Sequence, residues 1–156
     1  MKNKAKLKDI IEEMEMQFDG YRSFIKIGTG EVFSVAEDDL IDAEDEKPID
    51  DELQDWQIEN VEIANEIVEN FEDYKELPSK YEIDEYKMMK DFCLTVKDEK
   101  IQNILLITLA GKGALRRFKD AVIELNIEMD WYSYRDKRYK ELAIAWCQNN
   151  DIEYID

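Results

Sequence analysis

The sequence lacks histidine altogether, although it has 156 residues. Histidine is the commonest metal ligand and a frequent general base in enzymes, so its absence excludes every catalytic triad that depends on it. The two cysteines, Cys93 and Cys147, lie far apart and do not have the spacing of zinc ligands. The sequence therefore indicates no catalytic residue, no metal site and no cofactor, and it favours a protein that is not an enzyme.

Glycine and proline are also scarce, with five and two copies, which argues against long linkers. No apolar run approaches the ~18 residues that cross a membrane. The N-terminus has no apolar segment typical of a signal peptide, and both cysteines lie within apolar patterns. These features predict a single cytoplasmic domain over residues 1–156, with two buried, reduced thiols and no membrane contact.

Acidic residues outnumber basic ones by 39 to 21, so the formal net charge is −18. Such a charge repels polyanions, which excludes duplex DNA and anionic membranes as partners and favours a basic protein partner. The acids are densest over residues 36–51, where we expect a short helical turn followed by an acidic, mobile loop. This stretch lacks the alternating ligands and central glycine of a calcium-binding loop, so we interpret it as solvated.

The fold class predicted from periodicity is α+β, a mainly helical domain of about six helices packed with a small, mostly antiparallel sheet. Tyr21 to Ser34 reads as a β-hairpin around Gly28-Thr29-Gly30, and strands at residues 74–77 and 152–155 are expected to join its sheet. Helices are predicted over approximately residues 6–17, 51–70, 84–95, 98–109, 114–125 and 135–148. The helix at 98–109 is apolar on nearly all sides, and we expect it to be the central buried helix. Core positions are expected at Trp56, Phe71, Leu115, Phe118 and Trp146.

A basic island interrupts the acidic sequence at residues 111–119, where four cations fall within eight residues. Its Gly-Lys-Gly turn opens a helix, and free backbone N–H groups with a favourable helix dipole attract anions there. A nearby aromatic and basic segment begins at Trp131, and its rings could stack on a base or another planar ligand. The candidate residues for binding a nucleotide or small phosphorylated ligand are Lys112, Gly113, Arg116, Arg117, Trp131, Tyr132 and Arg135.

A purely structural interpretation of the same residues stays open. The glycines can serve a tight helix–helix turn, the cations can neutralise acidic helices, and Trp131 can belong to the core. Two helices joined by a glycine turn also resemble a helix-turn-helix, but the net charge of −18 opposes duplex binding.

Several short motifs, in their order and spacing, resemble the bacterial Uncharacterised Protein Family 0158. The resemblance spans nearly the whole chain and implies a bacterial cytoplasmic protein. It implies no activity, because the family has no established function and no assigned catalytic residues. The motifs are Leu77-Pro78-Ser79-Lys80, Glu85-Tyr86, Asp91-Phe92-Cys93, Gly111-Lys112-Gly113-Ala114, Arg116-Arg117-Phe118, Asp130-Trp131-Tyr132 and Trp146-Cys147.

Three functional hypotheses follow from the sequence. The favoured one is a non-enzymatic interaction module whose acidic surface binds a basic protein. The alternative is a binder of small anions, nucleotides or other phosphorylated ligands at the basic island. A carboxylate-dependent hydrolase is the third, and it would require a concave acidic pocket. The oligomeric state is left open.

Added salt is expected to raise the melting temperature of the protein, because counterions screen the repulsion among 39 acidic side chains. Thermal melting followed across a series of sodium chloride concentrations measures this effect. A melting temperature that does not respond to salt would contradict it.

Overall fold

A computed structural model describes residues 4–156 and confirms the predicted class, a mainly helical α+β fold with a small antiparallel sheet. The contacts of the chain form two compact units. Unit 1 comprises residues 1–82 and 143–156, and unit 2 comprises residues 83–142. The single domain over residues 1–156 stays a prediction.

The acidic charge is segregated between these two units. Unit 1 carries 28 acidic and 9 basic residues, which gives a net charge of −19. Unit 2 carries 11 acidic and 12 basic residues, which gives +1. The charge of the whole protein therefore belongs to unit 1, and unit 2 is close to neutral.

Unit 1 is built on a three-stranded antiparallel sheet in the order β3-β2-β4. The predicted hairpin is confirmed: β2 (Tyr21–Lys26) pairs with β3 (Val32–Ala36), and Phe24 lies opposite Phe33. Gly30 lies in the turn with φ +76°, a conformation that favours glycine. The third strand, β4 (Tyr74–Glu76), pairs with the other edge of β2. The prediction that this segment joins the hairpin sheet is therefore confirmed.

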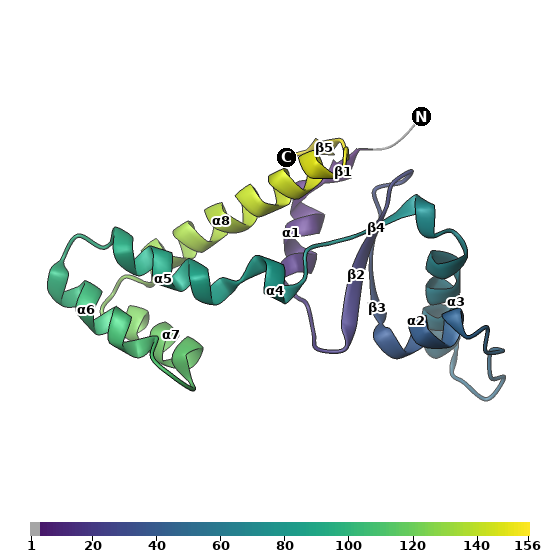
Figure 1. The fold of residues 1–156 in the computed structure, drawn as a ribbon, viewed down its shortest axis with the longest axis horizontal. Helices are drawn as coiled ribbons and strands as arrows, with labels where there is room; N and C mark the ends of the chain where they lie inside the picture. Colours follow the sequence, from purple (N-terminus) through teal and green to yellow (C-terminus); the bar gives the residue numbers. More distant parts are fainter. Residues whose placement is uncertain (1–3) are drawn as a thin grey trace. The chain divides into compact units, whose positions relative to one another are not determined.

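Helices α2 (Glu37–Glu44) and α3 (Asp55–Glu69) pack against each other and against β3 (Figure 1). A 3₁₀ turn, η1 (Phe71–Asp73), leads from α3 into β4. The apolar faces of these elements form one core cluster, consisting of Phe24, Val35, Leu40, Ala43, Ala64, Ile67 and Tyr74. Helix α2 has eight residues, so the acidic stretch contains more helix than the short turn expected from its charges. The mobility of the rest of residues 36–51 stays a prediction.

Two short strands and two short helices complete unit 1. Strand β1 (Ala5–Lys6) precedes α1 (Leu7–Glu15), and α4 (Lys80–Ile83) ends at the boundary between the units. The C-terminal strand β5 (Tyr154–Ile155) pairs with β1 in parallel. The expectation that the C-terminal strand joins the hairpin sheet is therefore wrong. Strand β1 has only two residues, which is too short for a periodic pattern to reveal it.

Unit 2 contains α5 (Glu85–Thr95), α6 (Glu99–Thr108), α7 (Ala114–Glu124) and most of α8 (Glu128–Asn149). Asp84 caps α5 as predicted, with its side chain accepting a hydrogen bond from the Lys87 backbone N–H. The centre of the unit is an aromatic cluster. The ring centroids of Phe118 and Trp131 lie 5.0 Å apart, and those of Phe92 and Trp131 lie 5.5 Å apart.

The prediction that α6 is the central buried helix is wrong. Leu105 is fully buried, whereas Ile104 and Ile107 are 46% and 73% exposed. Within unit 2, α6 contacts α5 and α7, and two neighbouring helices cover only part of a helix surface. An apolar residue on the uncovered part stays in solvent, which periodicity alone does not reveal.

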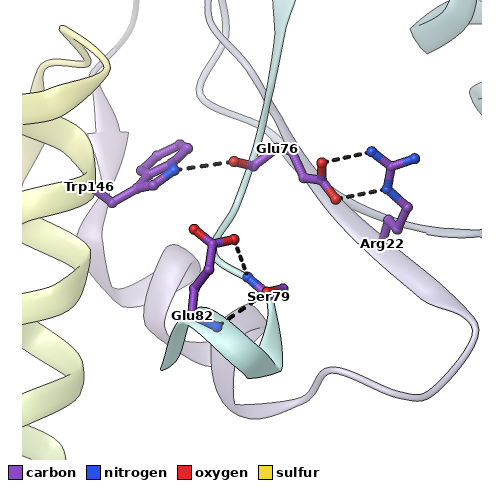
Figure 2. Close-up of polar contacts among 5 residues, drawn as sticks. All are labelled: Arg22, Glu76, Ser79, Glu82 and Trp146. Atoms are coloured by element: carbon purple, nitrogen blue, oxygen red, sulfur yellow. Dashed lines mark hydrogen bonds and ion pairs between the residues drawn. The ribbon is translucent and has the colours of Figure 1, made fainter. Parts of the chain in front are cut away.

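Other predicted core positions are exposed as well. Trp56 is 60% exposed in the first turn of α3, and Phe71 is 70% exposed in η1; both lie outside the core cluster. Leu115 is 47% exposed, since the buried face of α7 is set by Ala114, Phe118, Ala121 and Val122. Trp146 is half-buried, and its Nε1 donates to the Glu76 carbonyl oxygen (Figure 2).

The last helix begins earlier than predicted, at Glu128 instead of residue 135. Asn126 ends the previous helix with φ +57°, as its sequence position suggested, and α8 starts two residues later. Residues 131–134 include three aromatic residues, whose helix propensity is modest. Burial of Trp131 against Phe92 and Phe118 outweighs that propensity.

Replacing Phe118 with alanine is expected to lower the free energy of unfolding by about 3–5 kcal/mol, because the ring is fully buried. Ile107→Ala is the matched control, since this side chain is 73% exposed and its loss should change stability by less than about 0.5 kcal/mol. Urea denaturation of both variants measures the difference. Equal stabilities for the two variants would contradict the placement of Phe118.

Candidate functional site

The basic island forms the turn between α6 and α7 and the first turns of α7. Helix α7 begins at Ala114, directly after Gly113 in the left-handed conformation with φ +79°. Lys112 and Arg116 are exposed to solvent. The predicted helix N-terminus is thus present where the sequence placed it.

Arg117 has a structural role within this turn. Its Nε donates to the Thr108 carbonyl oxygen at 3.1 Å, and its two terminal nitrogens donate to the carbonyl oxygens of Ala110 and Lys112. Thr108 is the last residue of α6, where carbonyl groups lack helical partners and the helix dipole favours a cation. Ala110 and Lys112 lie in the turn that follows the helix. The Arg117 guanidinium therefore caps α6.

Gly113 is required by the same arrangement. Its positive φ is strained for residues with a side chain, and an added Cβ would lie 3.1 Å from Nη1 of Arg117. The glycine and the arginine thus fit together as one turn.

The two aromatic candidates, Trp131 and Tyr132, differ in their exposure to solvent. Trp131 is 1% exposed, and its Nε1 is buried with no hydrogen-bond partner among residues 4–156. Its ring packs in the core of unit 2, where a ligand on the surface does not reach it. Tyr132, the next residue in α8, is 47% exposed.

Arg135 is also engaged within unit 2. Its Nε donates to Glu85 Oε1 at 2.8 Å, and its guanidinium carbon lies 4.4 Å from the centroid of the Tyr139 ring. Of the predicted ligand-binding residues, Arg117 and Arg135 thus hold internal partners, whereas Lys112, Arg116 and Tyr132 are exposed. A phosphate-ligand site at the basic island stays a prediction.

Cations elsewhere in the described chain show a recurrent arrangement. Four of them lie over an aromatic ring and form an ion pair with a carboxylate, which combines Coulomb attraction with a cation–π contact. We call each such group a carboxylate–cation–ring triad. The triads are Arg22 with Glu76 and Phe24, Lys26 with Glu66 and Tyr74, Arg135 with Glu85 and Tyr139, and Arg138 with Asp91 and Tyr134.

The Arg22 triad has a bidentate ion pair. Nε and Nη2 of Arg22 each donate to a different carboxylate oxygen of Glu76 at 2.7 Å (Figure 2). The guanidinium carbon lies 5.4 Å from the Phe24 ring centroid. The hydrogen bonds to Glu76 raise the pKa of Arg22, so its guanidinium stays charged at all physiological pH values.

The Lys26 triad lies in an acidic depression of about 280 Å³, which we call the glutamate groove. Lys26 Nζ lies 3.6 Å from Glu66 Oε1 and 5.8 Å from the Tyr74 ring centroid. Burial, together with the charge of Glu66, raises the pKa of Tyr74 to about 12, so its hydroxyl is neutral and donates to Glu66. The groove is lined by Lys26, Glu31, Phe33, Glu59, Glu62, Ile63, Glu66 and Tyr74.

Only one wall of this groove was recognisable from the sequence. The acidic outer face of α3 was recognisable from helical spacing, and it includes Glu59, Glu62 and Glu66. Lys26 and Tyr74 come from β2 and β4, and strand pairing brings them beside that face. Long-range pairing of this kind is not encoded in any local pattern.

The two cysteines are free, fully buried thiols, as predicted. Burial raises the pKa of Cys93 and of Cys147 to about 11, so both are protonated at neutral pH and poorly nucleophilic. Across residues 4–156, no three acidic or cysteine side chains are grouped in a way that could hold a metal ion. No helix in the same range is long and apolar enough to cross a membrane.

Comparison with known proteins places the chain in a family. The sequence model of UPF0158, an uncharacterised protein family, matches residues 6–156. This chain belongs to UPF0158. The family resemblance inferred from the short motifs is thereby confirmed.

A UPF0158 protein of Pseudomonas aeruginosa is 30% identical to the chain over 67 residues. The match covers 42% of this chain and 44% of that relative, so it spans less than half the length of either protein. No solved structure matches the chain.

Replacing Arg117 with alanine is expected to lower the free energy of unfolding by about 1–2 kcal/mol, because one carbonyl oxygen at the end of α6 and two in the following turn lose a charged donor. Arg116→Ala removes the same charge from an exposed neighbour and should change stability by less than about 0.5 kcal/mol. Chemical denaturation distinguishes the two variants. If Arg116→Ala is the more damaging change, Arg117 does not cap α6.

Proposed function

We propose that this protein is a non-enzymatic interaction module that binds a basic partner protein through the acidic surface of unit 1. The observation that carries the proposal is the segregation of charge, −19 in unit 1 against +1 in unit 2. A surface of one sign attracts partners of the opposite sign, accelerates their association and rejects polyanions.

The glutamate groove supports a basic partner chemically. Its wall from α3 carries Glu59, Glu62 and Glu66, and the ring of Tyr74 lies with them. Carboxylates beside apolar and aromatic surface suit lysine and arginine, whose aliphatic stems and charged ends need both kinds of contact. Lys26 already occupies one part of the groove in this way.

The binding of a small phosphorylated ligand at the basic island is the less favoured function. Arg117 and Arg135, which were expected to hold the anion, donate to the Thr108 carbonyl oxygen and to Glu85. A non-enzymatic role is further supported by the absence of histidine from the sequence and by the protonated state of both thiols. No observation specifically favours a hydrolase.

The proposal predicts that a fluorescein-labelled lysine-rich peptide binds the full chain at low ionic strength, and that added salt weakens this binding. The double variant Glu59→Gln, Glu62→Gln should weaken the affinity about fivefold, because it removes two carboxylates that line the groove. Fluorescence anisotropy titrations give the dissociation constants.

The double variant Asp120→Asn, Glu124→Gln is the matched control, since it removes two exposed carboxylates from α7 in unit 2. Its affinity should stay within about twofold of the unmodified chain. An equal loss in both double variants would show that the peptide responds only to overall charge and would contradict a binding surface on unit 1. Absence of binding by the unmodified chain would contradict the proposed function itself.

A further inference from the structure

Unit 1 contains a second depression, and no lysine or arginine lines it. The glutamate groove, in contrast, is lined by Lys26. We call the second depression the Asp39 pocket. It has a volume of about 170 Å³ and lies where α2, β3 and the first half of α3 meet. Its lining residues are Tyr21, Ser34, Val35, Ala36, Asp39, Leu53, Trp56, Gln57, Asn60, Val61 and Ile63.

The pocket contains two of the three parts of a carboxylate–cation–ring triad. Asp39 supplies the carboxylate, and Tyr21 and Trp56 supply aromatic rings that are 49% and 60% exposed. The carboxylate makes no ion pair and no hydrogen bond with any residue in the described part of the chain. In the four complete triads the cation comes from the protein itself, and here it is missing.

In the free protein, the surroundings of Asp39 disfavour its ionised form. The carboxylate is half-buried, and desolvation raises its pKa, with further contributions from the negative charges of Asp42 and Asp38. A raised pKa means that the ionised form is disfavoured in the fold, and a nearby cation would remove that penalty. Unfavourable electrostatics concentrated in a pocket are typical of binding sites.

Trp56 is held in place at the edge of this pocket. Its Nε1 donates to Gln54 Oε1 at 2.9 Å, and Gln54 itself takes part in the capping box at the start of α3 with Gln57. A large aromatic ring that is exposed yet fixed by a hydrogen bond loses little conformational freedom when a ligand stacks on it.

The size and charge of the pocket define its ligand. Pockets for drug-sized molecules occupy about 300–1,000 Å³, so a cavity of about 170 Å³ admits one side chain and excludes a nucleotide. The surrounding unit has a net charge of −19, which repels anions and attracts cations. A planar guanidinium can stack on an aromatic ring while it donates two parallel hydrogen bonds to a carboxylate, which an ammonium cannot do.

We infer that the Asp39 pocket receives an arginine side chain of the basic partner, with Asp39 as the carboxylate and Trp56 and Tyr21 as the rings that complete the triad. This inference rests on the proposed function and adds to it the position and the chemistry of the anchoring residue. The glutamate groove, which contains its own lysine, then serves the surrounding basic residues of the partner.

The test uses two labelled, capped peptides that differ at one position. One peptide has an arginine between two pairs of lysines, and the other has a lysine in that position. Titrations followed by fluorescence anisotropy compare the unmodified chain with Asp39→Asn and Trp56→Leu. The unmodified chain should bind the arginine peptide several-fold more tightly, and each variant should lose about tenfold in affinity for it together with that preference.

Asp38→Asn is the matched control. Asp38 is exposed, precedes Asp39 in α2 and does not line the pocket, so its replacement removes the same charge from the same helix turn. Its affinity for the arginine peptide should stay within about twofold of the unmodified chain. Asp39→Asn should melt at or above the temperature of the unmodified chain, since it relieves a disfavoured charge.

Two outcomes would overturn the inference. If the unmodified chain binds both peptides and the Asp39 and Trp56 variants behave like Asp38→Asn, the pocket is not the anchor, while the proposed function survives. If the unmodified chain binds neither peptide, the proposed function fails and the inference fails with it. Should Asp39→Asn melt below the assay temperature, Trp56→Leu decides alone, because its ring is mostly exposed and outside the core.

Discussion

The constraint on which this structure depends is a shortage of cations. With 21 basic residues against 39 acidic ones, at least 18 acidic residues cannot each have a cation of their own. Four of the cations each contact a carboxylate and an aromatic ring at the same time. Each of these contacts is worth little on a solvated surface when it stands alone. In each triad the carboxylate and the ring contact the same cation.

The shortage of cations is confined to unit 1. Unit 2 carries nearly equal numbers of acidic and basic residues, and Arg117 of its basic island caps the end of α6. Unit 1 leaves carboxylates in excess, on the exposed face of α3 and around α2. An unbalanced surface costs stability through self-repulsion. A partner that supplies cations would reduce that cost, and its binding would then stabilise unit 1.

Local patterns were sufficient for most of the fold. The hairpin around Gly28-Thr29-Gly30, the Asp84 cap and the strand at residues 74–77 follow from turn chemistry and alternation, which are short-range properties. Burial was harder to predict. Ile107 and Leu105 belong to the same apolar run, and only the placement of α5 and α7 decides that one is exposed and the other buried. The partner of the C-terminal strand was missed for the same reason, because β1 lies at the opposite end of the sequence.

The candidate site illustrates the same limit. The basic island was conspicuous in the sequence because its charge contrasts with its surroundings, yet Arg117 and Arg135 serve the internal structure of unit 2. The Asp39 pocket had no comparable signal, since one aspartate among 39 acidic residues is unremarkable by composition. Its distinguishing feature is a missing cation beside Trp56 and Tyr21, which is visible only when three elements of the fold are brought together.

The most direct test of the account is a two-dimensional ¹H–¹⁵N NMR titration of the full chain with an arginine-containing basic peptide. We expect the largest shifts at backbone amides near residues 34–39 and 53–63 and at the indole N–H of Trp56, all of which surround the Asp39 pocket. The amides of unit 2 should be nearly unchanged. Shifts concentrated on residues 111–119, or spread evenly over both units, would contradict the claim that unit 1 receives the cation.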